Sequence, residues 1–246
     1  MLLQILTYTH HLTTMLFGIF LSAFFLGVKQ NKKNVCILLG GGAVSGLFFL
    51  ICNTVFGSLF TEAVYPIFVH LPLFLLLVFY YRFRWLPSII SIMTAYLCCQ
   101  FSNWAGIFAL SLSGLEWVYY LVRIIVTVAV FAFLSRYLCQ TTALLFAKSD
   151  RELYILGAMP FVYYVFDYST TKFSMLLYSG NKVVVEFLAF AMCISYVIFL
   201  FVYFQEYELK NSAEQYGQLT NMQLNSLHSE IEQVRSSEHR MKILRH

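Results

Sequence analysis

Charged, histidine and amide side chains interrupt several long apolar segments of this chain, and they are the residues whose types could carry chemistry. Carboxylates can accept protons or bind cations, guanidinium and ammonium groups can bind anions, and an imidazole can do either near neutral pH. Such groups are costly inside a bilayer, so they normally face the interior of a helix bundle or a watery cavity. The sequence therefore predicts a ligand-sensing cavity whose candidate residues are His70, Asn103, Arg123, Asp167, Lys172 and Glu186.

Ion pairing is the simplest role for the charged members of this set. Asp167 and Lys172 are five residues apart, about 140° around an α-helix, so they do not meet along one face. We expect Lys172 to reach Glu186 across the short "SGNK" turn, and Arg123 to be the cation that reaches Asp167. Such pairs could hold the bundle together or form a sensing site, and the sequence favours neither interpretation.

Prolines flank one of the candidate residues. His70 lies between Pro66 and Pro72, and a hydrogen-bonded histidine of the bundle interior is the favoured interpretation of its role. These two prolines, and Pro160 further along the chain, each remove an i→i−4 hydrogen bond. The sequence therefore predicts kinks at these positions, which could give the bundle its shape or act as hinges beside the cavity.

Familiar catalytic and metal-binding motifs are absent from the sequence. It has no His-Glu-x-x-His, no paired-glutamate motif and no Gly-x-Ser-x-Gly elbow, which argues against membrane proteolysis and hydrolysis. The run "GGGAVSG" lacks the Lys-Ser/Thr of a phosphate loop, and the spacing of Gly42 and Gly46 instead favours close helix packing. The cysteines lie in apolar runs and are predicted to be small buried hydrophobic residues, neither disulfide-bonded nor metal-binding: Cys36, Cys52, Cys98, Cys99, Cys139 and Cys193.

The composition indicates a polytopic membrane protein. The apolar fraction is 60% and the charged fraction 11%, whereas soluble domains have about 45–50% and about 25%. The first apolar segment has no basic lead and no small-residue cleavage site, so we expect a retained membrane span rather than a signal peptide. No internal repeat of the kind found in transporters is evident.

Seven apolar segments approach or exceed the roughly 20 residues that a helix needs to cross a bilayer. The predicted fold is all-α, with seven transmembrane helices in a domain over residues 1–205, followed by a cytoplasmic coiled-coil helix over 206–246. The predicted spans are 5–28, 35–57, 63–81, 86–112, 116–139, 153–178 and 183–205.

Basic residues predict the orientation of these spans, because lysine and arginine are enriched in cytoplasmic loops. They gather in the first, third and fifth loops, and the even loops contain only Lys182: the odd-loop residues are Lys29, Lys32, Lys33, Arg82, Arg84, Arg136, Lys148 and Arg151. The N-terminus is therefore expected outside and the C-terminus in the cytoplasm. With this orientation, the candidate residues of the cavity fall in the outer half of the membrane.

The segment 206–246 is polar and contains no proline. Its apolar residues follow the 3–4 spacing of a modest coiled-coil seam, interrupted at Glu238: Leu224, Leu227, Ile231, Val234 and Met241. As a helix with a rise of 1.5 Å per residue it would be about 60 Å long. No Gly-Pro break separates it from the seventh span, so a movement of that span could pass into the seam.

The last residues, "EHRMKILRH", resemble the start of the dimerisation and phosphoacceptor helix of sensor histidine kinases. The resemblance is to the subgroup with multi-span sensors and a GHKL-type ATPase domain, which includes peptide-sensing kinases of Gram-positive bacteria. In that subgroup the phosphorylated histidine often stands in "LRHD" or "RHD", which Leu244, Arg245 and His246 match up to the acidic residue. The motif covers only the last residues of the chain.

The resemblance implies that His246 is the phosphoacceptor of a protein histidine kinase. His239 occupies the same outward heptad position seven residues earlier, so heptad position does not separate the two, whereas the motif favours His246. The chain contains no ATP-binding motif and no cofactor site of its own, so ATP and Mg²⁺ are expected for a catalytic domain that is not part of this sequence. The expected partners are the lipid bilayer, a second copy of the chain, an extracellular ligand such as a peptide, and a response regulator, with no nucleic acid.

A non-enzymatic carrier or membrane scaffold with an oligomerising tail is the alternative. Continuation of the reading frame beyond His246 into ATP-binding motifs would favour the kinase, and a stop there would favour the alternative. The sequence does not specify the signal.

Overall fold

A computed structural model of the chain describes residues 2–57, 60, 64, 66–147, 149–172 and 182–243, with the backbone alone for 151, 168–172, 182–186 and 234–243. Within these ranges every regular element is a helix and no strand occurs, which confirms the predicted all-α fold. The longer helices in these ranges are α1 (Leu2–Phe25), α2 (Lys32–Phe56), α5 (Trp85–Cys98), α6 (Gln100–Ser113), α7 (Glu116–Tyr137), α9 (Asp150–Lys172) and α10 (Lys182–Ile243).

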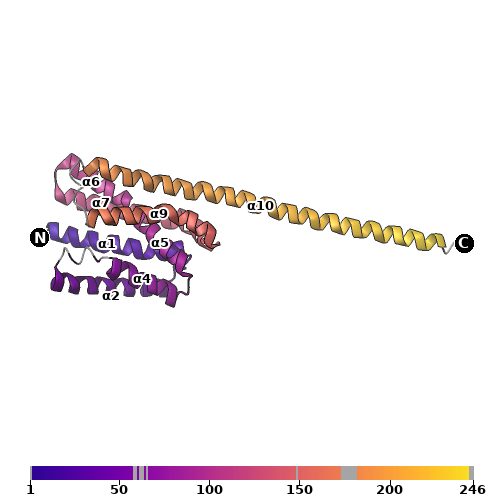
Figure 1. The fold of residues 1–246 in the computed structure, drawn as a ribbon, viewed down its shortest axis with the longest axis horizontal. Coiled ribbons are helices and arrows are strands. Elements are labelled where there is room, and N and C mark those ends of the chain that lie inside the picture. Colours follow the sequence, from indigo (N-terminus) through magenta and orange to yellow (C-terminus); the bar gives the residue numbers. More distant parts are fainter. Residues whose placement is uncertain are drawn as a thin grey trace. The chain divides into compact units, whose positions relative to one another are not determined.

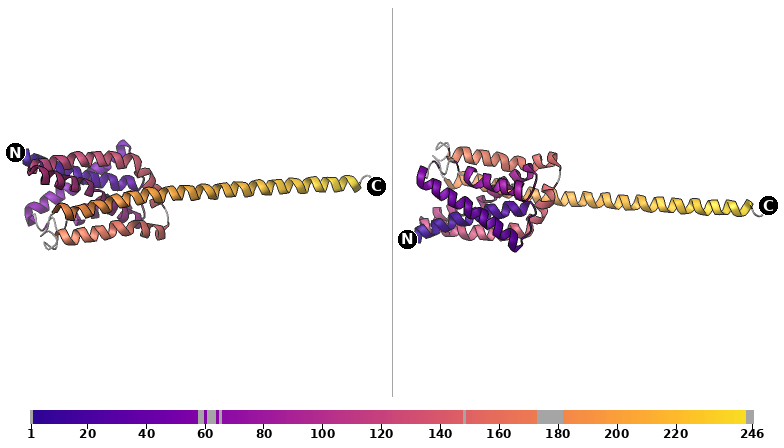
Figure 2. Two further views of the ribbon diagram at one scale, coloured as in Figure 1. Left: turned by 90° about the horizontal axis from the view of Figure 1, so that it is seen from above. Right: turned by 90° about the horizontal axis from the view of Figure 1, so that it is seen from below.

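The chain forms two compact units, Met1–Phe201 and Val202–His246. In the first unit the long helices lie side by side along roughly one direction, as the views in Figures 1 and 2 show. Helix α1 is central to this packing, because it contacts α2, α5, α7 and the short helix α8 (Cys139–Phe146). Helix α9 packs against α5, and α6 packs against α7.

Four helices within the described ranges are long and apolar enough to cross a membrane: Lys32–Phe56, Trp85–Ser113, Glu116–Tyr137 and the part of α10 that begins at Phe187. They correspond to four of the predicted spans, and a shorter apolar helix, Pro66–Tyr80, corresponds to a fifth. Helices α1 and α9 have the required length but are not among the four helices that are also apolar enough. They carry more polar side chains, such as His10 and His11 in α1 and Asp150 and Glu152 in α9.

Local sequence explains where several helices begin and end. The side chain of Asn31 caps α2 by accepting a hydrogen bond from the backbone N–H of Asn34 at 2.8 Å. Gly114, in the left-handed conformation at φ 68°, ends α6 and donates its N–H to the carbonyl of Leu110. The left-handed backbone conformation is strained for residues that have a Cβ atom, and glycine adopts it readily. Gly114 therefore ends the helix close to the boundary predicted from the sequence.

The predicted third span is irregular rather than one continuous α-helix. It consists of a π-helical turn η1 (Pro66–His70), a short α4 (Leu71–Leu75) and a second π-helical turn η2 (Leu76–Tyr80). Pro72 lies in the first turn of α4, where its missing N–H interrupts the α-helical hydrogen-bond pattern. The predicted break thus takes the form of wider turns, and Pro160 lies inside a continuous α9. Turns of this kind are frequent at functional sites, and η1 contains the candidate residue His70.

Helix α8, Cys139–Phe146, was not predicted, because its residues stand between two apolar segments and were assigned to a connector. Its Thr142, Leu145 and Phe146 are buried, and the helix packs against α1 and α7. It therefore closes the end of the bundle at which α7 ends.

Glycines allow close helix packing at several places. A side-chain carbon at Gly42 would lie 3.0 Å from Ile19, and one at Gly46 would lie 3.4 Å from Met15, so both glycines face α1. The predicted close helix contact is present, whereas its partner helix was not predicted. A closer approach occurs at Gly157 of α9, where an added Cβ would lie 2.7 Å from two atoms of Ile90 in α5. No periodic pattern of small residues predicts this contact.

The cysteines are free thiols, and most are buried as predicted, but Cys36 is exposed in the isolated chain, which corrects the expectation for that residue. It lies in the first turns of α2. Cys98 of α5 and Cys193 of α10 are both buried and lie near one another.

The close contact between α5 and α9 gives a test of the fold. We expect Gly157→Ala to destabilise the protein by about 1–3 kcal/mol, because the new methyl group must displace the buried Ile90 side chain. Ile90→Ala in the same chain should recover part of the loss, by making room for that methyl group. Gly40→Ala is the matched control, since nothing lies within 4 Å of the Cβ position there.

The measurement is the free energy of unfolding in mixed micelles for the single and double variants. Additive effects of Gly157→Ala and Ile90→Ala would show that α5 and α9 do not approach one another at these residues.

Candidate functional site

A tyrosine holds the partly buried carboxyl group of Asp167. Tyr96 of α5 donates its hydroxyl hydrogen to Oδ2 of Asp167 on α9, at an O···O distance of 2.5 Å. The contact joins two helices that also pack along their lengths.

His70 extends this network to a third element. Its Nδ1 lies 2.8 Å from the hydroxyl of Tyr164 on α9, within hydrogen-bond distance. The His70 ring also meets the ring of Tyr96 edge-on, with centroids 5.8 Å apart, and the Tyr96 and Tyr164 rings are 5.0 Å apart. His70, Tyr96, Tyr164 and Asp167 thus form one group, the tyrosine–carboxylate cluster, between η1, α5 and α9.

A second set of contacts anchors α10 close to this cluster. The buried Tyr196 of α10 donates its hydroxyl to the backbone carbonyl of Leu156 on α9 at 2.9 Å, and it lies 3.5 Å from Oγ1 of Thr94 on α5. Thr94 precedes Tyr96 by two residues, so the helix that holds Asp167 also holds α10. Trp104 of α6 stacks on Phe190 of α10, with ring centroids 4.4 Å apart.

Arg123 does not form the expected ion pair with Asp167. Within the described residues its Nη1 donates to the hydroxyl of Tyr119, one turn earlier on α7, and its Cζ lies 5.2 Å from the centroid of that ring. The prediction of an Arg123–Asp167 pair was wrong because Asp167, on α9, turns to α5 instead. An i, i+4 spacing of tyrosine and arginine was a local signal for the contact that does form.

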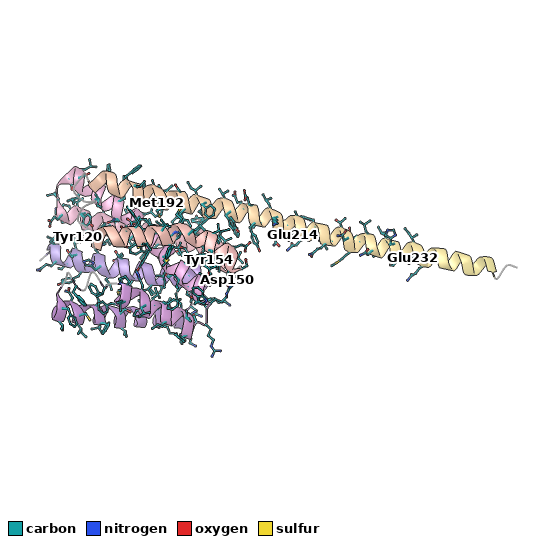
Figure 3. The ribbon with its side chains drawn as sticks, in the orientation of Figure 1. Tyr120, Asp150, Tyr154, Met192, Glu214 and Glu232 are labelled. Carbon is teal, nitrogen blue, oxygen red and sulfur yellow. The ribbon has the colours of Figure 1, made fainter. Side chains whose placement is uncertain are left out.

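The surroundings of Arg123 are basic and aromatic. His10 of α1 is buried, lies within electrostatic range of Arg123, and has its ring 5.8 Å from that of Tyr120. His11 follows, with its ring 5.3 Å from that of His10. Figure 3 shows Tyr120 at the end of the bundle where α1 begins, and Asp150 and Tyr154 at the opposite end. We refer to His10, His11, Tyr119, Tyr120 and Arg123 as the basic cluster.

Magnitudes show that the tyrosine does not by itself compensate Arg123. A cation–π contact contributes about 0.5–2 kcal/mol. Placing an arginine at the centre of a membrane helix costs about 2.5–3.5 kcal/mol on insertion scales, and less toward the interface. The guanidinium therefore requires further polar neighbours or access to water.

The remaining candidate residues are placed in part. Asn103 donates to Oε1 of Gln100 on the same helix at 3.1 Å, so this contact is local to α6. The side chains of Lys172 and Glu186 lie outside the described residues, and so does the predicted pair between them. His246 also lies outside the described residues.

Tyrosines supply most of the contacts that the sequence did not predict. Tyr96, Tyr164, Tyr119 and Tyr196 all bond through their hydroxyls, yet a tyrosine inside an apolar segment gives no sign of its partner. Among the described residues, no group of three or more histidine, cysteine or acidic side chains is arranged to hold a metal ion. The clusters offer groups that can bind a polar ligand or share a proton.

Comparison with known proteins gives no match to any family model, curated protein or solved structure. The functional interpretation therefore rests on the chain's own residues.

The Tyr96–Asp167 bond can be measured with a double-mutant cycle. We expect Tyr96→Phe and Asp167→Ala to be coupled by about 0.6 kcal/mol and at most about 1.7 kcal/mol, the average and the maximum found for hydrogen bonds inside a membrane protein. Each single substitution removes the Tyr96–Asp167 hydrogen bond, so the double variant loses this bond only once.

Unfolding free energies of the two single variants and the double variant in mixed micelles provide the coupling. Tyr154→Phe is the control, because this tyrosine of α9 is 60% exposed and its loss should change stability by less than about 0.5 kcal/mol. A coupling near zero would contradict the bond.

Proposed function

We propose that this chain is the membrane sensor module of a two-component histidine kinase. In this proposal seven helices cross the membrane with the N-terminus outside, and α10 leads into a cytoplasmic coiled coil that ends at the phosphoacceptor His246. The four apolar helices and the distribution of basic residues support this topology.

The observation that carries the proposal is the composition of α10. This helix runs for 62 residues, from Lys182 to Ile243, without a break in its helical assignment. Its first part includes Tyr196, which is buried and bonded to α5 and α9. In its later part every described side chain from Glu208 to Gln233 is exposed. One helix thus contains a segment suited to the membrane and a segment suited to water, which is what transmission from a sensor requires.

The exposed part of α10 contains an apolar seam that a second copy of the chain would cover. Leu224, Leu227 and Ile231 are 50%, 54% and 61% exposed and follow the 3–4 spacing of a coiled coil. Residues such as Glu214 and Glu232, labelled in Figure 3, make the rest of this segment polar. We propose a parallel homodimer through this seam, which brings two copies of His246 together.

Signal detection would act through the contacts that hold α10. A ligand that rearranges the tyrosine–carboxylate cluster changes α5 at Tyr96 and α9 at Asp167, and the same helices bind Tyr196 through Thr94 and Leu156. A ligand shifts such an equilibrium only by its difference in affinity for the two packings. The proposed output is a change in the seam that alters access of an ATP- and Mg²⁺-binding domain to His246, followed by phosphate transfer to a response regulator.

The proposed seam can be tested by crosslinking in membranes. In a chain whose native cysteines are replaced by serine or alanine, we expect Leu227→Cys to form a disulfide-linked dimer on mild oxidation. Asn225→Cys, about 160° around the helix, should crosslink several-fold less, because it faces away from the seam.

Gel mobility without reductant measures the dimer. Equal crosslinking at both positions, or none at either, would exclude a specific seam. Labelling of the same Leu227→Cys chain by a membrane-impermeant maleimide in intact cells would place this segment outside and overturn the proposed orientation.

Phosphorylation provides the functional test. In the kinase that contains this chain and an ATP-binding domain, we expect His246→Gln to abolish the acid-labile phosphorylation obtained with radiolabelled ATP. His239→Gln, seven residues earlier on the same helical face, should retain it.

Persisting label in the His246→Gln protein would show that another residue is the acceptor. Solute uptake that depends on Asp167, with no phosphorylation of any histidine, would instead establish a carrier.

A further inference from the structure

Arg123 retains a hydrogen-bond donor that the protein does not use. Its Nη1 is bonded to Tyr119, whereas its Nε is buried and has no hydrogen-bond partner in the part of the chain that the structure describes. A buried donor on a charged group is normally satisfied, because leaving it unpaired forfeits a strong interaction. The Nε group therefore has capacity for an acceptor.

No carboxylate neutralises this arginine within the described residues. Asp167 bonds to Tyr96, and Asp150 forms an ion pair with Arg84. Glu116 stands seven residues before Arg123 on the same helix face, about 10 Å along the axis, and is exposed. The groups nearest to Arg123 are neutral or basic, as described for the basic cluster.

The position of the guanidinium is fixed by a glycine. A Cβ placed on Gly106 of α6 would overlap the Cγ and Cδ atoms of Arg123 and lie 3.2 Å from the ring of Tyr119. The aliphatic part of the Arg123 side chain thus crosses α6 at Gly106, where that helix has no side chain. Helices α6 and α7 pack along their lengths, so this crossing is part of the bundle rather than a surface contact.

We propose that Arg123, with Tyr119 bonded to it, binds an anionic oxygen group, either a carboxylate or a phosphate. The group enters from the end of the bundle where α1 begins and where Figure 3 places Tyr120. Arginine suits this chemistry because its planar donors bond two oxygens of one anion, at N···O distances of about 2.7–2.9 Å. The inference rests on the proposed function only in assigning this end to the outer side of the membrane.

Two sources can supply this chemistry: the headgroup of a phospholipid and the carboxylate of a soluble ligand. They differ in the nucleus next to the arginine, phosphorus in one and carbon in the other. Dipolar dephasing in solid-state NMR reports this difference directly, without any need for signalling activity.

The experiment uses the full chain with ¹⁵N-labelled arginine in phosphatidylglycerol liposomes, with and without hexanoate labelled with ¹³C at its carboxyl group. The Arg123 Nε signal is identified as the one lost in Arg123→Lys. Dephasing of that signal by ³¹P supports the site with a lipid headgroup as its ligand, and dephasing by ¹³C supports it with a soluble carboxylate. Absence of both overturns the proposal.

A pair of glycine variants tests whether the site is built by the fold. Gly106→Ala keeps the arginine but displaces its stem, so the dephasing should fall strongly. Gly18→Ala should leave it unchanged, because nothing lies within 4 Å of the Cβ position there. Equal dephasing in both variants would show a mobile arginine that meets anions at the membrane surface, and would also overturn the proposal.

Failure of this proposal is distinguishable from failure of the proposed function. The crosslinking and phosphorylation tests report on α10 and His246, and neither requires an anion at Arg123.

Discussion

The arrangement of this protein depends on the cost of leaving a polar group without a partner in an apolar surrounding. The hydrocarbon region of a bilayer contains no hydrogen-bonding groups, so a side chain such as that of Asp167 must find a partner on another helix. Tyr96 meets this requirement for Asp167, and Tyr164 meets it for His70. These bonds fix how η1, α5 and α9 lie against one another, more specifically than apolar packing does.

The same constraint connects the candidate site with the last helix. Tyr196 is almost fully buried, and its hydroxyl is satisfied by groups on α5 and α9 rather than by its own helix. Moving α10 relative to these helices would leave a buried hydroxyl unpaired, so displacement occurs only if other bonds replace the lost ones. A helix held in this way can have a small number of discrete positions, which is a physical requirement for a two-state sensor.

Irregular backbone accompanies the polar contacts. The turns η1 and η2 widen the third apolar segment, and the first of them ends at His70. A wider turn changes the direction in which successive side chains leave the helix, and His70 here reaches tyrosines on both α5 and α9. Close packing at Gly157 brings α9 near α5, which makes the short Tyr96–Asp167 distance possible. Gly157, the prolines of the third apolar segment and the polar residues therefore act together in setting how η1, α5 and α9 pack.

Sequence alone determined the class of this fold and much of its local structure. The apolar segments and their polar limits predicted where the long helices begin to within a few residues, and Gly42 and Gly46 predicted a close helix contact, because helix starts and turn chemistry depend on neighbouring residues. The sequence also identified His70, Arg123 and Asp167 as candidate site residues, because a polar or charged side chain is energetically costly inside a membrane span. It did not give their partners, and the expected Arg123–Asp167 pair was wrong. Only the tertiary structure decided these partners, the additional helix α8 and the approach of α9 to α5 at Gly157. Each depends on which helices pack together and on how each helix is rotated about its axis. The residues next to a tyrosine do not indicate where its hydroxyl will bond.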